Sequence, residues 1–378
     1  MAQMEQLQTF MKTSSYRGLI NKYMPVLLAG IVFLIINTAF KSSGDPFRDG
    51  KLNFLIPAMC LYGVYFIYKK INRIIAAAMS ICVIHWALLG SQLYGLMFVA
   101  GSICVLIVSY KIAEKKELAM NLLRVTIWIQ VIYGISQLLG AHIWADKMPY
   151  FGSLAYGSIG HPTGYGIFLG ILFPMAFYYF SFFECLVLIA LILINFKAVP
   201  ILALVSGFFY LSWRELGNKV LVAFMPVVAG LALCSYLFPE IKFFSFDGRF
   251  FIWGEAWRNL NLIGHGPGSW FGLYQNWGIN YHNIWDYLHN DWLQLLFECG
   301  LGVFIICVYG FIKLSITLPK QYGMSLFIMG VGAMGEFPFH IASTAMVFCV
   351  ILCLGIIEME NKDALFKKTS QKARKKTS

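Results

Sequence analysis

The stretch YHNIWDYLHNDWLQLLFECGLG, residues 281–302, places polar side chains directly before an apolar, helix-like segment. It contains two His-Asn pairs seven residues apart, which begin at His282 and His289. If the helix extends upstream, His282, Asp286 and His289 share one face, because their spacing is i, i+4 and i+7. Three interpretations follow: a metal site of two imidazoles and a carboxylate, a general base beside a carboxylate that orients it, or a structural role in which these side chains hold the loop by hydrogen bonds.

Two further segments carry cations that could bind an anion. In DGRFFIWGEAW, Asp247 is a suitable helix N-cap, and Arg249, Trp253 and Trp257 would then share a face at i, i+4 and i+8. This segment is either an amphipathic interfacial helix or an arginine fork that grips phosphate oxygens beside aromatic rings. In FKAVPILALV, Lys197 either snorkels at a membrane boundary or contacts an anion.

The segment GHGPGSW carries three glycines, Gly264, Gly266 and Gly268. It is neither a P-loop nor a dinucleotide fingerprint, because no Gly-Lys-Ser/Thr follows and the glycine spacing is wrong. Glycine lets the backbone turn sharply or approach a ligand closely. We expect a turn here, with a backbone contact to a ligand as the alternative. The nine cysteines lie in apolar runs without a CxxC motif, so we expect neither a disulfide framework nor a cysteine zinc site.

The composition predicts a membrane protein. The chain of 378 residues is 59% hydrophobic and 12% charged, and its mean hydropathy is +0.69. Soluble domains are about 45–50% apolar and about 25% charged. Apolar runs of roughly the 20 residues that cross a bilayer recur along the chain. We therefore expect an all-α polytopic membrane protein, a single integral membrane domain over 1–378. Its twelve expected spans are roughly 24–40, 52–68, 74–90, 92–110, 118–140, 163–181, 183–196, 198–213, 217–238, 292–312, 321–337 and 340–358.

The basic residues predict the orientation of these spans. With the N-terminus in the cytoplasm, 21 of the 29 Lys and Arg fall on the cytoplasmic side, as the positive-inside rule requires. The basic tail 359–378 is then cytoplasmic, and both termini are inside. The net charge of +11 is an orientation signal on this interpretation and not a nucleic-acid surface. Residues 239–291 form one large outer loop, rich in aromatic residues, in which we expect short helices.

Several motifs together resemble one family. HNDWLQLLFECGLGVF resembles the H-N-x-x-L-x-x-x-x-E-x-G-x-x-G pattern of the O-antigen ligase family, which related polymerases and pilin oligosaccharyltransferases share. The matching residues are His289, Asn290, Leu293, Glu298 and Gly300, with Gly302 one residue earlier than the usual second glycine. RFFIWGEAWRNLNLIGHGPGSW is similar to the family's Arg-three-residues-Trp segment and glycine turn, GSIGHPTGYGIFLGILFP to its glycine-proline start of a span, and EFPFH to its last outer-side turn. The resemblance covers roughly residues 155–345.

Two positions depart from the family's pattern. Lys197 stands where the family usually has an arginine, which keeps the charge but loses the bidentate fork. Pro162 and Thr163 stand where an asparagine is common. Both departures concern the outer side, so they leave the sugar of the donor open.

The resemblance implies a fold and a reaction. The fold is GT-C-like, with the large loop on the periplasmic side of a bacterial inner membrane. The reaction transfers a glycan from undecaprenyl pyrophosphate to an acceptor hydroxyl, such as that of lipid A core, in lipopolysaccharide or surface polysaccharide biosynthesis. It inverts the anomeric carbon and requires no metal and no cofactor. The roles that the resemblance implies are a base at His289, donor and pyrophosphate contacts at Arg249, Lys197, Arg258, Gly264, Gly266 and Gly268, and accessory functions at His282, Asn290, Asp286 and Glu298.

Other functions remain open on the sequence. A polymerase of the same superfamily would use another lipid-linked repeat as acceptor, and a pilin-type enzyme would use a protein hydroxyl. A polysaccharide transporter or flippase would need ionisable residues near the bilayer midplane, whereas the mid-span positions here are nearly all apolar. The expected partners are therefore a lipid-linked glycan donor, a glycolipid or glycan acceptor and the bilayer, without nucleic acid.

Overall fold

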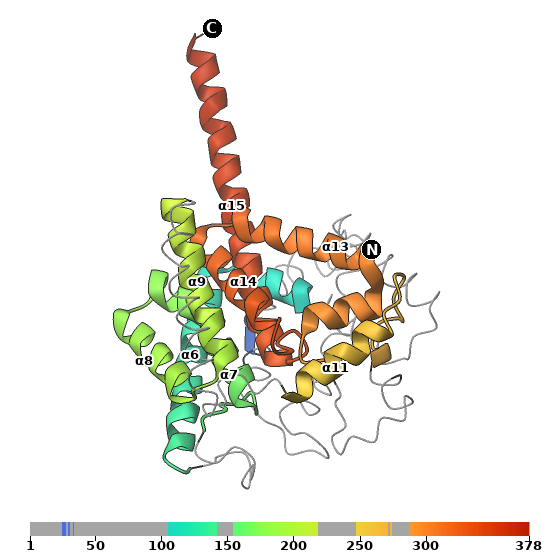
Figure 1. Ribbon diagram of the computed structural model, residues 1–378. Helices are drawn as coiled ribbons and strands as arrows, with labels where there is room; N and C mark the ends of the chain where they lie inside the picture. The colour runs from blue at the N-terminus through green and yellow to red at the C-terminus, as the bar shows by residue number, and fades with distance from the viewer. Residues whose placement is uncertain are drawn as a thin grey trace, which may run out of the picture.

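The computed structural model describes residues 25–27, 29–30, 33, 105–141, 154–217, 247–270, 273 and 287–377. All regular structure in these residues is helical, and they contain no strand. The helices are α6 (Lys116–Leu138), α7 (Pro162–Tyr179), α8 (Phe182–Ile194), α9 (Ala198–Leu216), α11 (Asp247–Arg258), α13 (Asp291–Thr317), α14 (Lys320–Gly332) and α15 (Ala342–Thr377), as labelled in Figure 1.

Four of the described helices are long and apolar enough to cross a membrane: α6, α9, α13 and the Ala342–Gln371 part of α15. A helix lies at each expected span from 118 to 213 and from 292 to 358. Beyond its apolar part, α15 continues through the basic tail and projects away from the other helices (Figure 1). The spans expected at 52–68, 74–90 and 217–238, and most of those at 24–40 and 92–110, lie outside the described residues, so the total of twelve stays a prediction.

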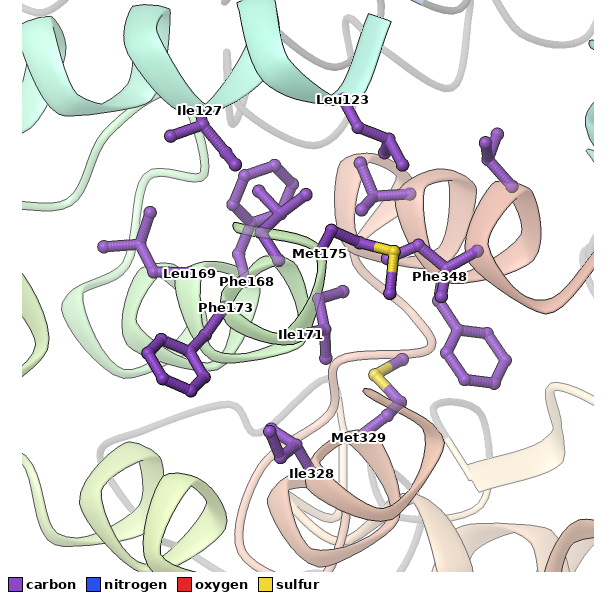
Figure 2. Close-up of a cluster of buried hydrophobic side chains, with 14 of the residues drawn as sticks. Leu123, Ile127, Phe168, Leu169, Ile171, Phe173, Met175, Ile328, Met329 and Phe348 are labelled. Carbon is purple, nitrogen blue, oxygen red and sulfur yellow. The ribbon is translucent and has the colours of Figure 1, made fainter. Parts of the chain in front are cut away.

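Helix α7 is the centre of the bundle. Its residues from Pro162 to Ala176 are all buried, as expected for a helix that is apolar on every side. It packs against α6, α8, α9 and α14. Figure 2 shows Phe168, Ile171 and Met175 of α7 among side chains of α6, α14 and α15. Small residues allow the close approach of α9 to α14, because a Cβ at Gly207 would lie 2.6 Å from Ile328.

The loop that precedes α7 is held by side chains from its neighbours. Three buried amides, those of Gln130, Gln137 and Asn195, bond residues 155–158 at 2.7–3.0 Å. Buried backbone polar groups need such partners, so these bonds determine the path of the loop. The loop ends at His161, whose side chain caps α7 by accepting the N–H of Gly164 at 3.5 Å.

Helix α13 breaks at Gly300, where the backbone has φ 78° and ψ 173°. The turn that follows α11 packs against this break, and Leu301 N–H donates to the carbonyl of Leu262 at 2.9 Å. A Cβ at Gly300 would lie 2.4 Å from the backbone of Ile263, so only glycine fits. A second hydrophobic cluster joins α11 to the first arm of α13, through Ile252, Ala256, Trp270, Leu288, Leu293, Leu296 and Phe297.

Candidate functional site

A single buried carboxylate organises the candidate site. Glu336 lies in the connection between α14 and α15, and its side chain is 0% exposed. Nδ1 of His289 lies 2.6 Å from its Oε1, and Nη2 of Arg249 lies 3.1 Å from its Oε2. Arg249 also donates from Nη1 to the carbonyl of Gly335. Nδ1 of His161 lies 3.8 Å from Oε2. Groups from α11, the α7 loop and the turn before α13 therefore converge on Glu336.

The charges around Glu336 keep it ionised. Burial alone would raise the pKa of this carboxyl group, but His289, His161 and Arg249 together lower the pKa to about 2. An ionised carboxylate is an acceptor only, so Nδ1 of His289 carries the proton of the bond between them. Nε2 of a neutral His289 then holds the lone pair, which is the arrangement that a general base requires.

His289 sits in an unusual backbone conformation. Its φ is 50°, in the left-handed region that residues other than glycine seldom adopt. Trp253 of α11 donates from Nε1 to the carbonyl of Leu288 at 2.7 Å. Asn290 is the N-cap of α13, because its side chain accepts the N–H of Leu293 at 3.0 Å. Both neighbours of His289 are thus held.

This conformation corrects one expectation from the sequence. Helix α13 begins at Asp291 and does not extend upstream through His289. The expected helical face of His282, Asp286 and His289 is therefore wrong for His289, because α13 begins only after its N-cap, Asn290. His282 and Asp286 themselves lie outside the described residues.

The other two cations expected at the site, Lys197 and Arg258, have different surroundings. Lys197 directly precedes α9. Burial lowers the pKa of His161, and the neighbouring His289, Arg249 and Lys197 lower it further, against the opposing effect of Glu336. Arg258 lies in the last turn of α11 with a side chain 73% exposed, where it pairs with Glu255. The structure thus brings Arg249 to Glu336, whereas Lys197 influences His161 and Arg258 pairs with Glu255.

Glu298 stabilises the glycine turn. Its side chain lies within α13 and its Oε2 accepts the N–H of Gly268 at 2.8 Å. Its Oε1 accepts the N–H of Trp270 at 3.4 Å and a side-chain N–H of Gln294 at 3.0 Å. With both oxygens bonded to the turn and to α13, Glu298 is a structural contact of the glycine segment in this structure.

The three glycines form the expected turn. Gly264, Gly266 and Gly268 have φ values of 88°, 98° and 77°, which favour glycine. Gly264 donates its N–H to the carbonyl of Asn261 at 3.0 Å, and Gly266 donates to the carbonyl of Glu298 at 2.8 Å. Together with the bond from Gly268 to Glu298, all three N–H groups are bonded within the protein. A ligand would have to displace these bonds to use them.

Four residues of this region had no assigned role on the sequence alone: Glu336, His161, Asp291 and His340. His340 Nδ1 lies 2.6 Å from Asp291 Oδ1, which makes a second histidine–carboxylate pair. The quoted segments EFPFH and GSIGHPTGYG contain three of the four. These residues could have been identified in the sequence as ionisable residues at the ends of apolar spans, because burying an ionisable side chain costs free energy unless it is paired.

An apolar groove of about 800 Å³ lies between α9, α11, α13 and α14, and Asn290, the residue after His289, is part of its lining. Near the site it is lined by Asn290 and by the indoles of Trp253 and Trp257. Its other end reaches Trp213 and Ser315, at the opposite end of the helices. The three residues that were predicted to share a face of α11 therefore make different contacts: Arg249 reaches Glu336, and Trp253 and Trp257 line the groove.

Within the described residues, no group of three or more His, Cys, Asp or Glu side chains could hold a metal ion. The metal interpretation of the stretch depended on His282 and Asp286, which are outside that part of the chain. It is therefore untested by the geometry.

Comparison of the chain with protein-family models gives no match, and comparison with curated proteins gives none either. The function is accordingly inferred from the residues of the site and from the resemblance of the motifs.

Proposed function

We propose that the chain is a membrane glycosyltransferase of the O-antigen ligase type, which transfers a glycan from undecaprenyl pyrophosphate to an acceptor hydroxyl, such as that of lipid A core. The observation that carries the proposal is the pair of His289 and Glu336, with Arg249 beside it, next to an apolar groove that Asn290, the residue after His289, helps to line. The reaction needs a base, positive charge for the leaving group and space for a long lipid chain, and these three features meet these needs.

In the proposed reaction, the acceptor oxygen attacks the anomeric carbon while His289 Nε2 takes the hydroxyl proton. The bond from that carbon to the pyrophosphate oxygen breaks, and its electron pair leaves with the pyrophosphate, so the anomeric configuration inverts. Glu336 holds the imidazole ring by Nδ1 and stabilises the imidazolium that forms, as a buried carboxylate does in hydrolase triads. Arg249 and Lys197 offset the negative charge that grows on the leaving group. The leaving group is already activated, so the proposed step uses no cofactor.

The groove would hold the polyprenyl chain of the donor. Its lining is almost wholly aromatic and aliphatic, and isoprenoid carbons need no polar partner. Lipid tails are as apolar as this lining, so the groove would contribute little net hydrophobic affinity. Its contribution is orientation, because a chain that lies between α11 and α13 directs its pyrophosphate towards Asn290 and His289.

The proposal includes an orientation in a bacterial inner membrane, with about twelve spans, a periplasmic loop over 239–291 and cytoplasmic termini. Charges of the described helices support it. Arg214 and Lys320 lie together at the end opposite Glu336, where Arg214 donates to the carbonyl of Ile316 at 2.6 Å and Lys320 pairs with Glu215. By the positive-inside rule this end faces the cytoplasm, so the site of Glu336 faces the periplasm.

The proposal is tested with purified protein in nanodiscs, a lipid-linked oligosaccharide and a panel of acceptors: lipid A core, a second lipid-linked repeat and a pilin-type peptide. Release of glycan from the carrier is measured with and without a chelator. We expect chelator-insensitive transfer, with a loss on the order of 10²–10⁴ in His289→Ala, the range of general-base catalysis. The acceptor that gains the glycan distinguishes ligase, polymerase and protein glycosylation.

His282→Ala is the matched control for His289→Ala, because both histidines precede an asparagine in the same stretch. Retention of transfer by His282→Ala supports His289 as the base. Chelator-sensitive transfer with equal losses in both variants would instead restore the metal interpretation. If the unmodified protein releases no glycan from any matched donor, the proposed activity is wrong and a transport function gains support.

A further inference from the structure

Two histidine–carboxylate pairs connect the same two turns in opposite directions. In the first pair, His289 of the turn before α13 contacts Glu336 of the turn before α15. In the second pair, Asp291, the first residue of α13, contacts His340 of the turn before α15. Both pairs have an N–O separation of 2.6 Å. His289 and Asp291 are two residues apart, so a change in the position of Asp291 is transmitted to His289 through a short piece of backbone.

The second pair is a buried clamp. The side chains of Asp291 and His340 are 4% and 11% exposed. Asp291 Oδ2 also accepts the N–H of Phe339 at 2.8 Å, and its own N–H donates to the carbonyl of Ala333 at 2.9 Å. A buried carboxylate with this number of partners is fully committed to structure and has little access to substrate. It is therefore a different kind of group from Glu336, whose partners His289 and Arg249 belong to the proposed chemistry.

We propose that Asp291 and His340 are a positioning pair that holds His289 against Glu336 in the geometry for proton transfer; this inference rests on the proposed function. The left-handed backbone of His289 is unfavourable by itself and persists only where its surroundings impose it. The cap at Asn290 stabilises only the start of α13, whereas the side chain of Asp291 bonds this start to the turn that carries Glu336, through Phe339 and His340. When this tie is lost, His289 can relax towards a regular backbone and its ring moves relative to Oε1.

A carboxylate at the first residue of a helix also interacts favourably with the helix dipole. That role alone would give Asp291 an effect on stability and none on turnover by the folded enzyme. The two roles are therefore separated by kcat per folded molecule, measured on monodisperse protein.

The test compares Asp291→Ala, Asp291→Asn, Glu336→Gln and the double variant Asp291→Ala/Glu336→Gln. A displacement of about 1 Å in a catalytic group can cost about 10²-fold in rate. We expect Asp291→Ala to lower kcat by roughly 10- to 100-fold with little change in the KM for donor. Asp291→Asn keeps an oxygen for Phe339 N–H and should lose less. In the Glu336→Gln background, Asp291→Ala should cost little more, because coupled residues are not additive.

A second measurement does not require activity. Diethyl pyrocarbonate acylates unprotonated imidazole nitrogen, and peptide mass spectrometry reports the rate at each histidine. We expect Asp291→Ala and Asp291→Asn to change the labelling rate of His289 and to leave that of His265 unchanged. His265 is a matched control because it lies on the glycine turn and contacts neither carboxylate pair; its Nε2 lies 2.8 Å from the carbonyl of Asn259.

The outcomes separate the two proposals. If the unmodified enzyme is active and Asp291→Ala keeps its kcat, the positioning role is overturned while the proposed function stands. Full additivity with Glu336→Gln also overturns it. If the unmodified protein is inactive with every donor, the proposed function fails, and the labelling rate of His289 decides whether the clamp exists. An unchanged rate in both Asp291 variants refutes the clamp.

Discussion

Replacement of Glu336 by glutamine tests the centre of the site, because it preserves the shape of the side chain and removes its charge. The neighbours of Glu336 lower its pKa from 4.5 to about 2 in spite of burial. At 1.36 kcal/mol for each pKa unit, this difference corresponds to about 3 kcal/mol of stabilisation of the ionised form. His289 is the largest of the favourable contributors, ahead of His161 and Arg249.

Part of that free energy is available to catalysis. A negative Glu336 stabilises the positive imidazolium that forms at His289 in the transition state, and glutamine cannot. If between half and all of the roughly 3 kcal/mol acts on this step, Glu336→Gln lowers kcat by about 10- to 100-fold, since 1.36 kcal/mol is tenfold in rate. The expected change in the KM for donor is small, because the fully buried side chain of Glu336 has no exposed surface with which to bind the donor.

The assay is the release of glycan from the lipid carrier in nanodiscs, at saturating donor and acceptor. Glu255→Gln is the matched control, because Glu255 is also a carboxylate on this side of the protein and pairs with the exposed Arg258. It should retain nearly full activity. If Glu336→Gln keeps kcat within about twofold of the unmodified enzyme, the charge of Glu336 does not support His289 and the reasoning is refuted.

Three further predictions follow from the same geometry. Arg249→Lys should lower transfer at least tenfold, because lysine cannot bond both Glu336 and the carbonyl of Gly335 as a fork. Arg258→Ala should leave transfer nearly unchanged. Equal activity of the two variants in the glycan-release assay would contradict the role of Arg249 at the site. Since the folded-state pKa of Glu336 lies below 4.5, its contribution to stability is complete above about pH 4.5 and is lost as the pH falls to about 2. The difference in unfolding free energy between the unmodified protein and Glu336→Gln, followed by tryptophan fluorescence, should therefore shrink over that interval, and a constant difference would argue against an ionised Glu336. Leu296→Trp should fill the groove near the site and raise the KM for a long-chain donor more than for a short-chain analogue, and an equal effect on both donors would mean that the groove does not hold the lipid.

The local features of the fold were predictable from the sequence. The helices from α6 to α9 and from α13 to α15 begin within about two residues of the expected spans, because the length and hydropathy of a span are properties of contiguous residues. The turn at Gly264, Gly266 and Gly268 was predictable for the same reason. The spacing of the residues did not exclude an upstream extension of α13, because spacing alone does not show that Asn290 caps the helix. The left-handed backbone of His289 was equally hidden from the sequence.

The roles within the site were less accessible. His289 and Arg249 were selected from spacing and resemblance, and the structure places both on one carboxylate. That carboxylate is 47 residues from His289 and 87 residues from Arg249 along the chain, so no local pattern connects them. Glu298 matched a motif, yet its oxygens bond the glycine turn.

The sequence by itself determined that this chain forms long apolar helices and places most of its basic residues between them, because hydropathy and charge act over a single turn or span. Only the tertiary structure decided which ionisable groups meet. The pairing of His289 with Glu336 and of Asp291 with His340 depends on α14 packing beside α13, which brings the connection from α14 to α15 to the start of α13. Burial then makes each pairing obligatory, since an unpartnered charge at these positions would be far costlier than at the surface.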